Sequence, residues 1–285
     1  MTTTLRPEGP ETSTAGGGRT RRWRICANGR PVGALRTSVV TRGGQLWGEI
    51  AELEVHEGRG RGRGTFGALA AEEVLRGWGC TRVDADIPEG ARLARSLAVT
   101  LGYAERMRNM AKRLSGPPAL PPGVAARPIG AEEFPGWLAD AKEGYLRDLV
   151  SSGLAEEQAR AKSDADHVNL LPQGADTPGV ALRRLWGAGP DPAGPDPLGS
   201  LWLALRVRDL PDGSPLAWVM VVEVTQAHRG RGYGRALMLL AEQECLGAGV
   251  RDLGLNVFSG NEAAIRLYDS LGYRVTNRVY GKALI

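Results

Sequence analysis

Apolar and polar positions along the chain follow two different periods, and each change of period predicts a change between strand and helix. In the second half, runs of β-branched and large apolar residues predict strands, whereas apolar residues three and four positions apart predict helices. The predicted strands are 180–186, 200–207, 216–224, 252–258 and 273–284. The predicted helices are 132–152, 155–166, 235–242 and 261–271. This alternation is typical of an α/β fold.

The first half of the chain has a shorter version of the same order. Its predicted strands are 22–25, 32–41, 46–55 and 82–87, and its one predicted helix is 67–76. We expect it to contain no counterpart of the first strand and the helix pair that occupy 124–166 in the second half. Residues 1–20 are rich in Gly, Thr and Glu, and this composition predicts a disordered tail.

The two halves also share sequence. A shift of 170 positions aligns residues 59–114 with 229–284 without a gap, and 19 of the 56 aligned residues are identical. The match begins with RGRGRG against RGRGYG and extends to a shared Lys and Leu at its end. An internal repeat of this kind predicts two copies of one fold. We call 59–114 the first repeat and 229–284 the second repeat.

A proline-rich segment, SGPPALPPG at 115–123, separates the two copies. Its four prolines disfavour a helix and predict an extended linker. The expected domains are therefore a shortened, degenerate N-terminal domain at 21–114 and a complete C-terminal domain at 124–285. A second Pro/Gly-rich tract at 187–199 has strand patterns on both sides, so we expect a loop there rather than a domain boundary.

The composition is that of an ordinary folded protein, with 42% hydrophobic and 24% charged residues. The longest unbroken apolar run, Leu216–Val222, is far shorter than the ~20 residues that a membrane span needs. The first twenty residues have no apolar stretch typical of a secretory signal. The three cysteines lack paired spacing, which argues against a disulfide framework and a zinc site. We therefore expect a cytoplasmic protein with no metal and no membrane partner.

The net charge of +4 is unevenly distributed, with +7 in residues 1–117 and −3 in residues 118–285. The basic part of the chain could attract an anion such as a phosphate-bearing cofactor or a nucleic acid. An Arg/Gly tract that binds nucleic acid usually lies in long disordered repeats with aromatic residues. The run at 58–64 is instead short and lies between a predicted strand and a predicted helix, so we expect no nucleic-acid partner.

The loop RGRGYG at 229–234 carries the strongest chemical signal, because it joins a predicted strand to a predicted helix. Backbone N–H groups and the dipole at a helix N-terminus bind anions, and glycine lets a phosphate approach the backbone. The P-loop pattern GxxxxGK[ST] is absent. The dinucleotide pattern GxGxxG occurs at 62–67, but a single match in a chain with 40 glycines is weak. The pattern Arg/Gln-x-x-Gly-x-Gly/Ala fits 229–234 at every position.

With this loop, residues 217–284 resemble the GNAT superfamily of acyl-CoA-dependent N-acetyltransferases. The resemblance also rests on a strand that ends in Glu-Val and on four later segments, which are Leu255–Phe258, Asn261–Ala264, Leu267-Tyr268 and Leu271–Tyr273. The first repeat resembles the same superfamily more weakly, and the whole chain is similar to tandem proteins such as the mycothiol synthase family. The resemblance implies two tandem mixed-sheet α/β domains, the N-terminal one shortened and degenerate, with acetyl-CoA as the cofactor.

In this superfamily the loop amides hold the coenzyme pyrophosphate, and the thioester lies against the end of the preceding strand. A bulge there commonly separates this strand from the next one. The resemblance therefore implies coenzyme contacts at Val222, Val224, Arg229, Gly230, Arg231, Gly232, Tyr233, Gly234, Arg235, Asn261 and Tyr268. The glycine loop of the first repeat makes Arg59, Gly60, Gly62 and Gly64 candidates for a second coenzyme site, and a packing scaffold without coenzyme is the alternative.

Two residues are candidates for proton transfer. The resemblance implies Tyr268 as the acid that protonates the departing thiolate, and we predict Glu223 as the base that deprotonates the amine. A strand carboxylate in solvent, a core aromatic and a helix cap are the alternative interpretations of Glu223, Tyr268 and Asn261. The first repeat has alanine, at Ala91 and Ala98, where the second has Asn261 and Tyr268. We therefore expect catalysis in the C-terminal domain alone.

The leading hypothesis is direct transfer of an acetyl group from acetyl-CoA to the primary amine of a small molecule. The acceptor should meet the segments 132–166 and 187–199, whose acidic and aromatic residues favour a small cationic amine. A non-catalytic acyl-CoA-binding or regulatory protein and a protein N-acetyltransferase are the alternatives. The chain is also a candidate homodimer.

Overall fold

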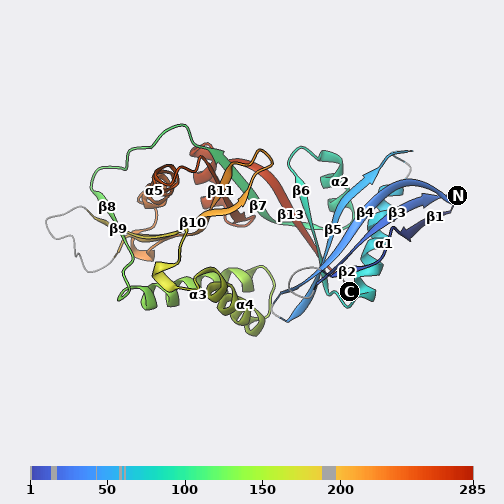
Figure 1. The fold of residues 1–285 in the computed structure, drawn as a ribbon, viewed down its shortest axis with the longest axis horizontal. Helices are drawn as coiled ribbons and strands as arrows, with labels where there is room; N and C mark the ends of the chain where they lie inside the picture. Colours follow the sequence, from blue (N-terminus) through green and yellow to red (C-terminus); the bar gives the residue numbers. More distant parts are fainter. Residues whose placement is uncertain are drawn as a thin grey trace. The chain divides into compact units, whose positions relative to one another are not determined.

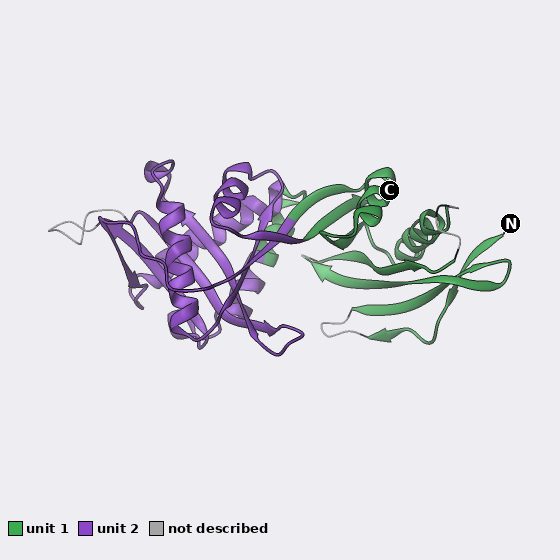
Figure 2. Ribbon diagram, turned by 90° about the horizontal axis from the view of Figure 1, so that it is seen from above, with its two compact units in different colours: residues 1–107, 152–162, 277–285 green, residues 108–151, 163–276 purple. Residues whose placement is uncertain are grey.

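The computed structural model describes residues 2–13, 18–42, 44–57, 60, 62–187 and 197–284. The backbone divides into two compact units, which Figure 2 shows in different colours. Unit 1 contains residues 1–107, 152–162 and 277–285, and unit 2 contains residues 108–151 and 163–276. Each unit has a mixed β-sheet with helices packed on it, so the predicted α/β class is confirmed.

Unit 1 is a sheet with the strand order β1-β3-β4-β5-β6-β13, in which only β5 and β6 pair in parallel. Helices α1 and α2 share one hydrophobic core with this sheet, where Ile25, Leu35 and Leu75 are fully buried. The elements are β1 (Thr3–Pro7), β2 (Thr12–Ser13), β3 (Arg19–Ala27), β4 (Arg30–Arg42), β5 (Gln45–Val55), α1 (Arg63–Gly77), β6 (Arg82–Pro88), α2 (Arg92–Thr100) and β13 (Arg274–Ala283).

Unit 2 has the strand order β7-β12-β11-β10-β9-β8 and helices on both faces of its sheet. Helices α5 and α6 pack on one face, and α3 packs on the other with α4 beside it, as Figure 1 shows. The elements are β7 (Ala104–Arg113), β8 (Val124–Pro128), α3 (Phe134–Ser151), α4 (Glu156–Leu170), β9 (Val180–Gly187), β10 (Gly199–Asp209), β11 (Pro215–Val224), α5 (Tyr233–Gly247), β12 (Asp252–Phe258) and α6 (Glu262–Ser270).

Each unit is completed by the last strand of the other repeat. In unit 1, β13 of the second repeat pairs antiparallel with β6, and Lys282 Nζ lies 2.9 Å from a carboxylate oxygen of the buried Glu72. In unit 2, the end of β7 from the first repeat lies beside β12, and Lys112 Nζ lies 2.6 Å from a carboxylate oxygen of the buried Glu242. The 170-residue shift equates the two lysines and the two glutamates, so the same ion pair occurs twice with its partners exchanged.

The compact units differ from the expected domains 21–114 and 124–285 because of this exchange. Residues 108–114 belong with unit 2, while 277–285 and the segment 152–162 belong with unit 1. The sequence repeat identified the two copies but not the exchange of their last strands. The apolar pattern of a strand does not show which edge of which sheet the strand joins. Residues 115–123 contain no helix or strand, as expected for a linker.

Two expectations for the N-terminal region are wrong. Residues 3–7 form β1, which pairs antiparallel with β3 along its whole length, whereas a disordered tail was expected over 1–20. The side chain of Leu5 packs against the core of unit 1, which offsets the entropy of ordering the segment. Because β1 pairs with β3 as β8 pairs with β9, unit 1 does contain a counterpart of the first strand. In the described residues between β1 and β3, only the two-residue strand β2 replaces the α3–α4 pair.

Candidate active site

Two neighbouring parallel strands separate in the middle of the sheet of unit 2. The pairing of β11 with β12 ends at Val219 opposite Leu255, although β11 continues to Val224 and β12 to Phe258. A bulge at Met220 in β11 begins at the same point, because Trp202 pairs with Val221 while Leu203 pairs with Val219. The extra residue bends β11 away from β12. The result is the separation of strands that was expected beside Val222 and Val224.

The glycine loop lies directly after the separated end of β11. Gly230 and Gly232 have φ values of +76° and +86°, a left-handed conformation that other residues adopt at a cost, and Gly232 is the N-cap of α5. A Cβ atom added at either glycine would meet no atom within 4 Å, so the space in front of the loop is open. The loop therefore presents backbone N–H groups of the first turn of α5 to an anion.

The strand end, the loop and α6 meet at Gly234. A Cβ atom at this position would lie 3.2 Å from the side chain of Leu267 and 3.8 Å from that of Val224. The Arg235 guanidinium donates to Ser270 Oγ at 2.6 Å, which ties the first turn of α5 to the end of α6. Arg229 Nε donates to the Val224 carbonyl oxygen at 3.2 Å, so the loop is also tied to the end of β11.

The glycine loop is open in front of Gly230 and Gly232, and it lies beside the point where β11 and β12 stop pairing. Arg229, Arg231 and Arg235 supply positive charge at or beside the loop, so an anion is the ligand that this arrangement favours. The ring of Tyr233 lies 6.2 Å from that of His228 in an edge-to-face arrangement, which packs the two side chains that flank the loop.

Glu223 lies near the end of β11 on the sheet face that α3 covers. Its register partner on β10 is Ser200, and its side chain is 33% exposed. Burial raises the pKa of the Glu223 carboxyl, and Asp140 and Asp148 of α3 raise it further, whereas Arg147 and Arg229 act in the opposite direction. The nearest cation is the Arg147 guanidinium, 4.0 Å from Glu223 Oε1. A carboxylate with a raised pKa is a stronger base than one in water.

Helix α3 approaches this carboxylate at Gly144. A Cβ atom at Gly144 would lie 3.8 Å from Arg147 Nη2 and 3.9 Å from Glu223 Oε2, both ordinary van der Waals distances. Asp140 and Asp148 lie one turn before and after Gly144 on the same side of the helix. Burial also raises the pKa of Asp148.

Tyr268 lies on α6, which packs on the opposite sheet face from α3. Its side chain is 8% exposed, its ring centroid lies 6.1 Å from that of Tyr273, and burial raises its pKa to about 12. Asn261 caps α6, since its Oδ1 accepts a hydrogen bond from the Ala264 N–H at 3.1 Å. The structure therefore places Glu223 and Tyr268 on the two faces of the sheet, with the gap between β11 and β12 as the opening in that sheet.

Unit 1 repeats the backbone geometry of this site. The parallel pairing of β5 with β6 ends at Glu49 opposite Asp84, and β5 carries a bulge at which Glu52 has a φ of +53°. Gly60 and Gly62 have φ values of +80° and +72°, and a Cβ atom at Gly64 would make only ordinary contacts with Leu97 and Val55. Arg59, the remaining predicted residue of this second site, lies outside the described residues.

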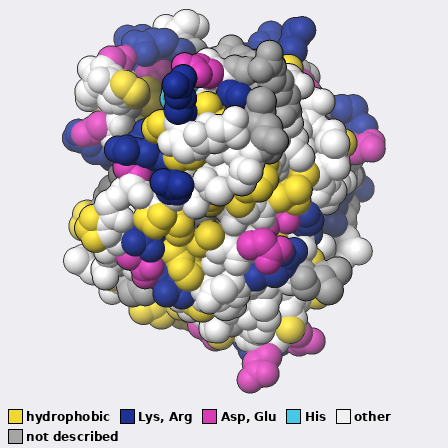
Figure 3. Space-filling view, turned by 90° about the vertical axis from the view of Figure 1, so that its right-hand side faces the viewer, with side chains coloured by type: hydrophobic (Ala, Val, Ile, Leu, Met, Phe, Trp, Pro, Cys, Tyr) yellow, Lys and Arg dark blue, Asp and Glu magenta, His cyan; other side chains and the backbone are white. Residues whose placement is uncertain are grey.

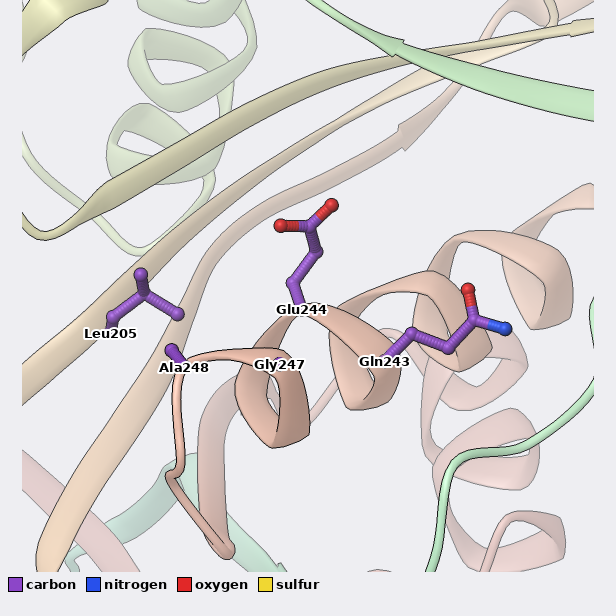
Figure 4. A pocket seen from close by; sticks show the side chains of 5 residues that line it. All are labelled: Leu205, Gln243, Glu244, Gly247 and Ala248. Atoms are coloured by element: carbon purple, nitrogen blue, oxygen red, sulfur yellow. The ribbon is translucent and has the colours of Figure 1, made fainter.

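Two other surface features are separate from the glycine loop. A hollow of about 450 Å³ lies at the C-terminal end of α5, far along the helix from the glycine loop, and is lined by Leu205, Gln243, Glu244, Gly247 and Ala248 (Figure 4). On the face in Figure 3, Lys and Arg side chains are scattered among acidic and hydrophobic ones instead of forming one basic surface. Among the helices that the structure describes, none has the length and hydropathy of a membrane span.

Helix α3 lies within the predicted acceptor segment 132–166, which includes Asp148. The sequence did not indicate that Gly144 and Asp140 lie near Glu223. A glycine within an otherwise helical pattern was the available signal, because such a glycine usually has a packing or functional reason. The predicted loop at 187–199 lies mostly outside the described residues.

Comparisons with known proteins agree on one family. The model of the acetyltransferase (GNAT) family matches residues 192–273. A mycothiol acetyltransferase of Thermobispora bispora is 33% identical over 236 residues, which cover 78% of this chain and 71% of the relative. Among solved structures, a GCN5-related N-acetyltransferase from Sphaerobacter thermophilus has a TM-score of 0.59 at 20% identity, over 92% of this chain and 80% of that chain. A tandem GNAT protein from the clavulanic acid biosynthesis pathway has a TM-score of 0.52 at 18% identity, over 96% and 85%.

Proposed function

Because the chain belongs to the GNAT family of acetyltransferases, which use acetyl-CoA, we propose that unit 2 transfers the acetyl group to the primary amine of a small molecule. The observation that carries this proposal is the joint presence, in one unit, of the open glycine loop, the strand gap beside it and a carboxylate of raised pKa. The relative named mycothiol acetyltransferase supports a small-molecule acceptor.

The coenzyme would be held by the loop and the first turn of α5. Backbone N–H groups from Gly230 to Gly234 donate to the pyrophosphate, and Arg231 adds a cation beside it. Along the gap, the unpaired backbone at Val222 and Val224 holds the extended arm. An N–H of this strand end polarises the acetyl carbonyl. Acetyl-CoA supplies an activated thioester, which the amine attacks directly.

Glu223 would accept the proton that the acceptor amine must lose before it attacks. A primary ammonium has an ordinary pKa of ~10, so a base near it is needed at neutral pH. Burial under α3 raises the pKa of Glu223, which brings the basicity of the carboxylate closer to that of the amine. Asp140 and Asp148 of α3 act on Glu223, and their negative charge favours a cationic acceptor.

Tyr268 would act from the other face of the sheet. With a pKa of about 12 its phenol stays protonated throughout the working pH range, so it is always a hydrogen-bond donor. A thiol has a pKa of ~8.5, and the phenol therefore stabilises the leaving thiolate mainly by donating a hydrogen bond to sulfur. Asn261 fixes the start of α6 and so the position of Tyr268 two turns later.

Unit 1 retains the framework without the chemical groups, and we propose that it holds a coenzyme without catalysing transfer. Its loop glycines have the same left-handed conformation as those of unit 2, and its strands separate in the same way. The residues at the positions of Asn261 and Tyr268 are Ala91 and Ala98. With alanine at the position of Tyr268, and with no helix pair between β1 and β3 among its described residues, this unit lacks the equivalents of the proposed donor for the thiolate and of the cover for an acceptor.

Native mass spectrometry of the chain titrated with acetyl-CoA tests both proposals, with release of the coenzyme thiol as the assay of turnover on a panel of primary amines. We expect two coenzymes per chain. Gly234→Trp, which fills the space beside Leu267, should remove one coenzyme and all turnover. The matched variant Gly64→Trp should remove the other coenzyme and leave turnover intact. Failure to bind any coenzyme at high concentration would remove the basis of the proposed function.

A further inference from the structure

Three aromatic rings between α3, α4 and β10 carry buried nitrogens without hydrogen-bond partners. Trp137, His167 and Trp202 are 2%, 4% and 3% exposed. Within the described part of the chain, Trp137 Nε1, Trp202 Nε1 and His167 Nε2 have no partner. The rings form one layer, because the centroid of Trp202 lies 5.9 Å from that of Trp137 and 5.4 Å from that of His167. Buried polar atoms are almost always satisfied, so three together indicate a missing polar group.

The tautomer of His167 determines what that group must be. Its Nδ1 lies 2.7 Å from the carbonyl oxygen of Ser163, and since a carbonyl only accepts, Nδ1 carries the proton. Burial lowers the pKa of His167, so the ring is neutral and Nε2 is a bare acceptor. The layer therefore offers one acceptor and two indole N–H donors. An O–H group is complementary to this set, because it both donates and accepts.

The layer lies beside the candidate base. Trp202 pairs with Val221, and Ser200, two residues before Trp202, pairs with Glu223. Cross-strand partners and residues two apart share a sheet face, so Trp202 and Glu223 are diagonal neighbours under α3. The same helix contributes Trp137 to the layer and Gly144 beside Glu223. The aromatic layer and the candidate base therefore lie on one face of the sheet, under one helix.

Two polar side chains of α3 near the layer are already engaged. Tyr145 Oη donates to Asp166 Oδ2 at 3.0 Å, and Lys142 Nζ lies 2.7 Å from Asp164 Oδ1. The partly buried neighbours on β11, Met220 and Val221, are apolar. Arg184 Nε and Trp186 Nε1 on β9 are further buried nitrogens without a hydrogen-bond partner in the described structure, but the aromatic layer alone combines two indole donors with an imidazole acceptor.

We propose that Trp137, His167 and Trp202 bind a hydroxyl group of the acceptor, so that the substrate is a hydroxylated primary amine of the amino-alcohol or amino-sugar class. This inference rests on the proposed acetyl transfer to a small amine. A bound water would offer the same O–H chemistry, and the experiment below separates the two sources. The hydroxyl donates to His167 Nε2 and accepts from an indole N–H, while the amine lies at Glu223.

Matched acceptors that differ by one hydroxyl test the proposal, such as trans-2-aminocyclohexanol against cyclohexylamine. We expect kcat/KM to favour the hydroxylated amine by more than tenfold, because a site built to hydrogen-bond an O–H rejects the analogue without it. His167→Phe should bring the ratio close to one without changing the KM for acetyl-CoA. His167→Gln, which keeps an acceptor, should restore part of the preference. A ratio near one in the unaltered protein, or a preference that survives His167→Phe, would mean that the layer holds only water.

A second measurement does not depend on turnover. In the ¹⁵N-labelled protein with coenzyme A, trans-2-aminocyclohexanol should shift two indole N–H resonances that Trp137→Phe and Trp202→Phe identify. Cyclohexylamine should leave them in place, and equal shifts with both amines would overturn the inference. Turnover without hydroxyl preference refutes the inference alone. The absence of coenzyme binding, in contrast, refutes the proposed function.

Discussion

Unit 1 and unit 2 build the same gap by the same steps but surround it differently. In each, a bulged strand leaves its parallel neighbour after a few paired residues, and a left-handed glycine then begins the helix. In each, a buried glutamate of that helix pairs with a lysine from the other repeat. Among the described residues, α3 packs over the bulged strand of unit 2, and α6 carries Tyr268 at the position where α2 of unit 1 carries Ala98. The framework of a coenzyme site and the groups that perform transfer are therefore separable in this fold.

The comparison of the two units predicts that acetyl transfer depends on the phenol of Tyr268. Replacing Tyr268 with Phe should lower kcat by about 10²- to 10⁴-fold, the usual contribution of a positioned acid, with little change in the KM for acetyl-CoA. Steady-state kinetics with a responsive amine would measure both parameters. The matched control is Tyr103→Phe in unit 1, where the lost hydroxyl donates to Glu72. That variant should lose stability but keep its kcat.

The reciprocal change sharpens the same comparison. Ala98→Tyr places a phenol at the equivalent position of α2 but adds neither a base nor an acceptor cover. We expect no new activity in a Gly234→Trp background, in which unit 2 is blocked. Turnover recovered in that double variant would show that unit 1 lacks only a proton donor.

The exchanged ion pairs predict the next largest effect. Lys112→Met removes the cation beside the buried Glu242 in unit 2, and Lys282→Met removes the cation beside the buried Glu72 in unit 1. Each change should lower the free energy of unfolding by less than the about 3–5 kcal/mol of a fully uncompensated buried charge. The loss at Glu72 should be partial, because Tyr103 Oη still donates to it. Urea denaturation followed by tryptophan fluorescence would measure the loss.

A double replacement separates buried charge from strand exchange. Lys112→Met combined with Glu242→Leu removes both charges and should recover most of the stability, because apolar residues replace buried ion pairs at little cost. If the double variant is as unstable as the single one, the pair contributes by fixing the position of β7 and not merely by neutralising Glu242.

The sequence predicted the elements of this fold better than their connections. The apolar runs at 216–224 and 252–258 and the helix after the glycine loop lie within two residues of the observed β11 and β12 and within α5, since each is determined by local periodicity. The pairing of β13 with β6 depends on which sheet edge each strand meets, and no local pattern contains that information. β1 was missed because its five residues show little alternation and gain order only from pairing with β3.

The candidate site shows the same division. The loop at 229–234 and the cap at Asn261 are signatures written in consecutive residues, and the structure places both at helix starts. The approach of Gly144 to Glu223 and the layer of Trp137, His167 and Trp202 join residues from distant segments. In the sequence these residues look like ordinary helix and strand residues. Only the register of the sheet shows that they lie on one face.

The raised pKa of Glu223 predicts a pH dependence that unit 1 has no part in. Below this pKa the carboxyl is protonated and cannot accept the amine proton, so log kcat/KM should rise with pH by about one per unit and then level. Glu223→Gln should remove this rise. Amines of different pKa should shift only the part of the pH profile that depends on ionisation of the acceptor. If the rise persists in Glu223→Gln, a group other than Glu223 is the base.

The same shift has a consequence for stability. Because the pKa of Glu223 is higher in the folded than in the unfolded chain, the folded state binds this proton more tightly. The resulting stabilisation is present at acid pH and is lost as pH rises through the folded pKa. Glu223→Gln should therefore raise the Tm at neutral pH and have no such effect at acid pH.

The smallest predicted effect concerns the cap that distinguishes α6 from α2. Asn261 and Ala91 have nearly the same backbone conformation at their N-caps, with φ/ψ of −88°/68° and −85°/63°. Asn261→Ala should cost about 1 kcal/mol of unfolding free energy, and Ala91→Asn should gain up to about the same amount, because the backbone already suits a capping side chain. Asn261 is also a predicted coenzyme contact, and the affinity for acetyl-CoA tests this second role. If Asn261→Ala weakens coenzyme binding and Ala91→Asn strengthens it at unit 1, the asparagine side chain contacts the coenzyme. If both variants bind acetyl-CoA as the unaltered protein does, Asn261 is a helix cap alone.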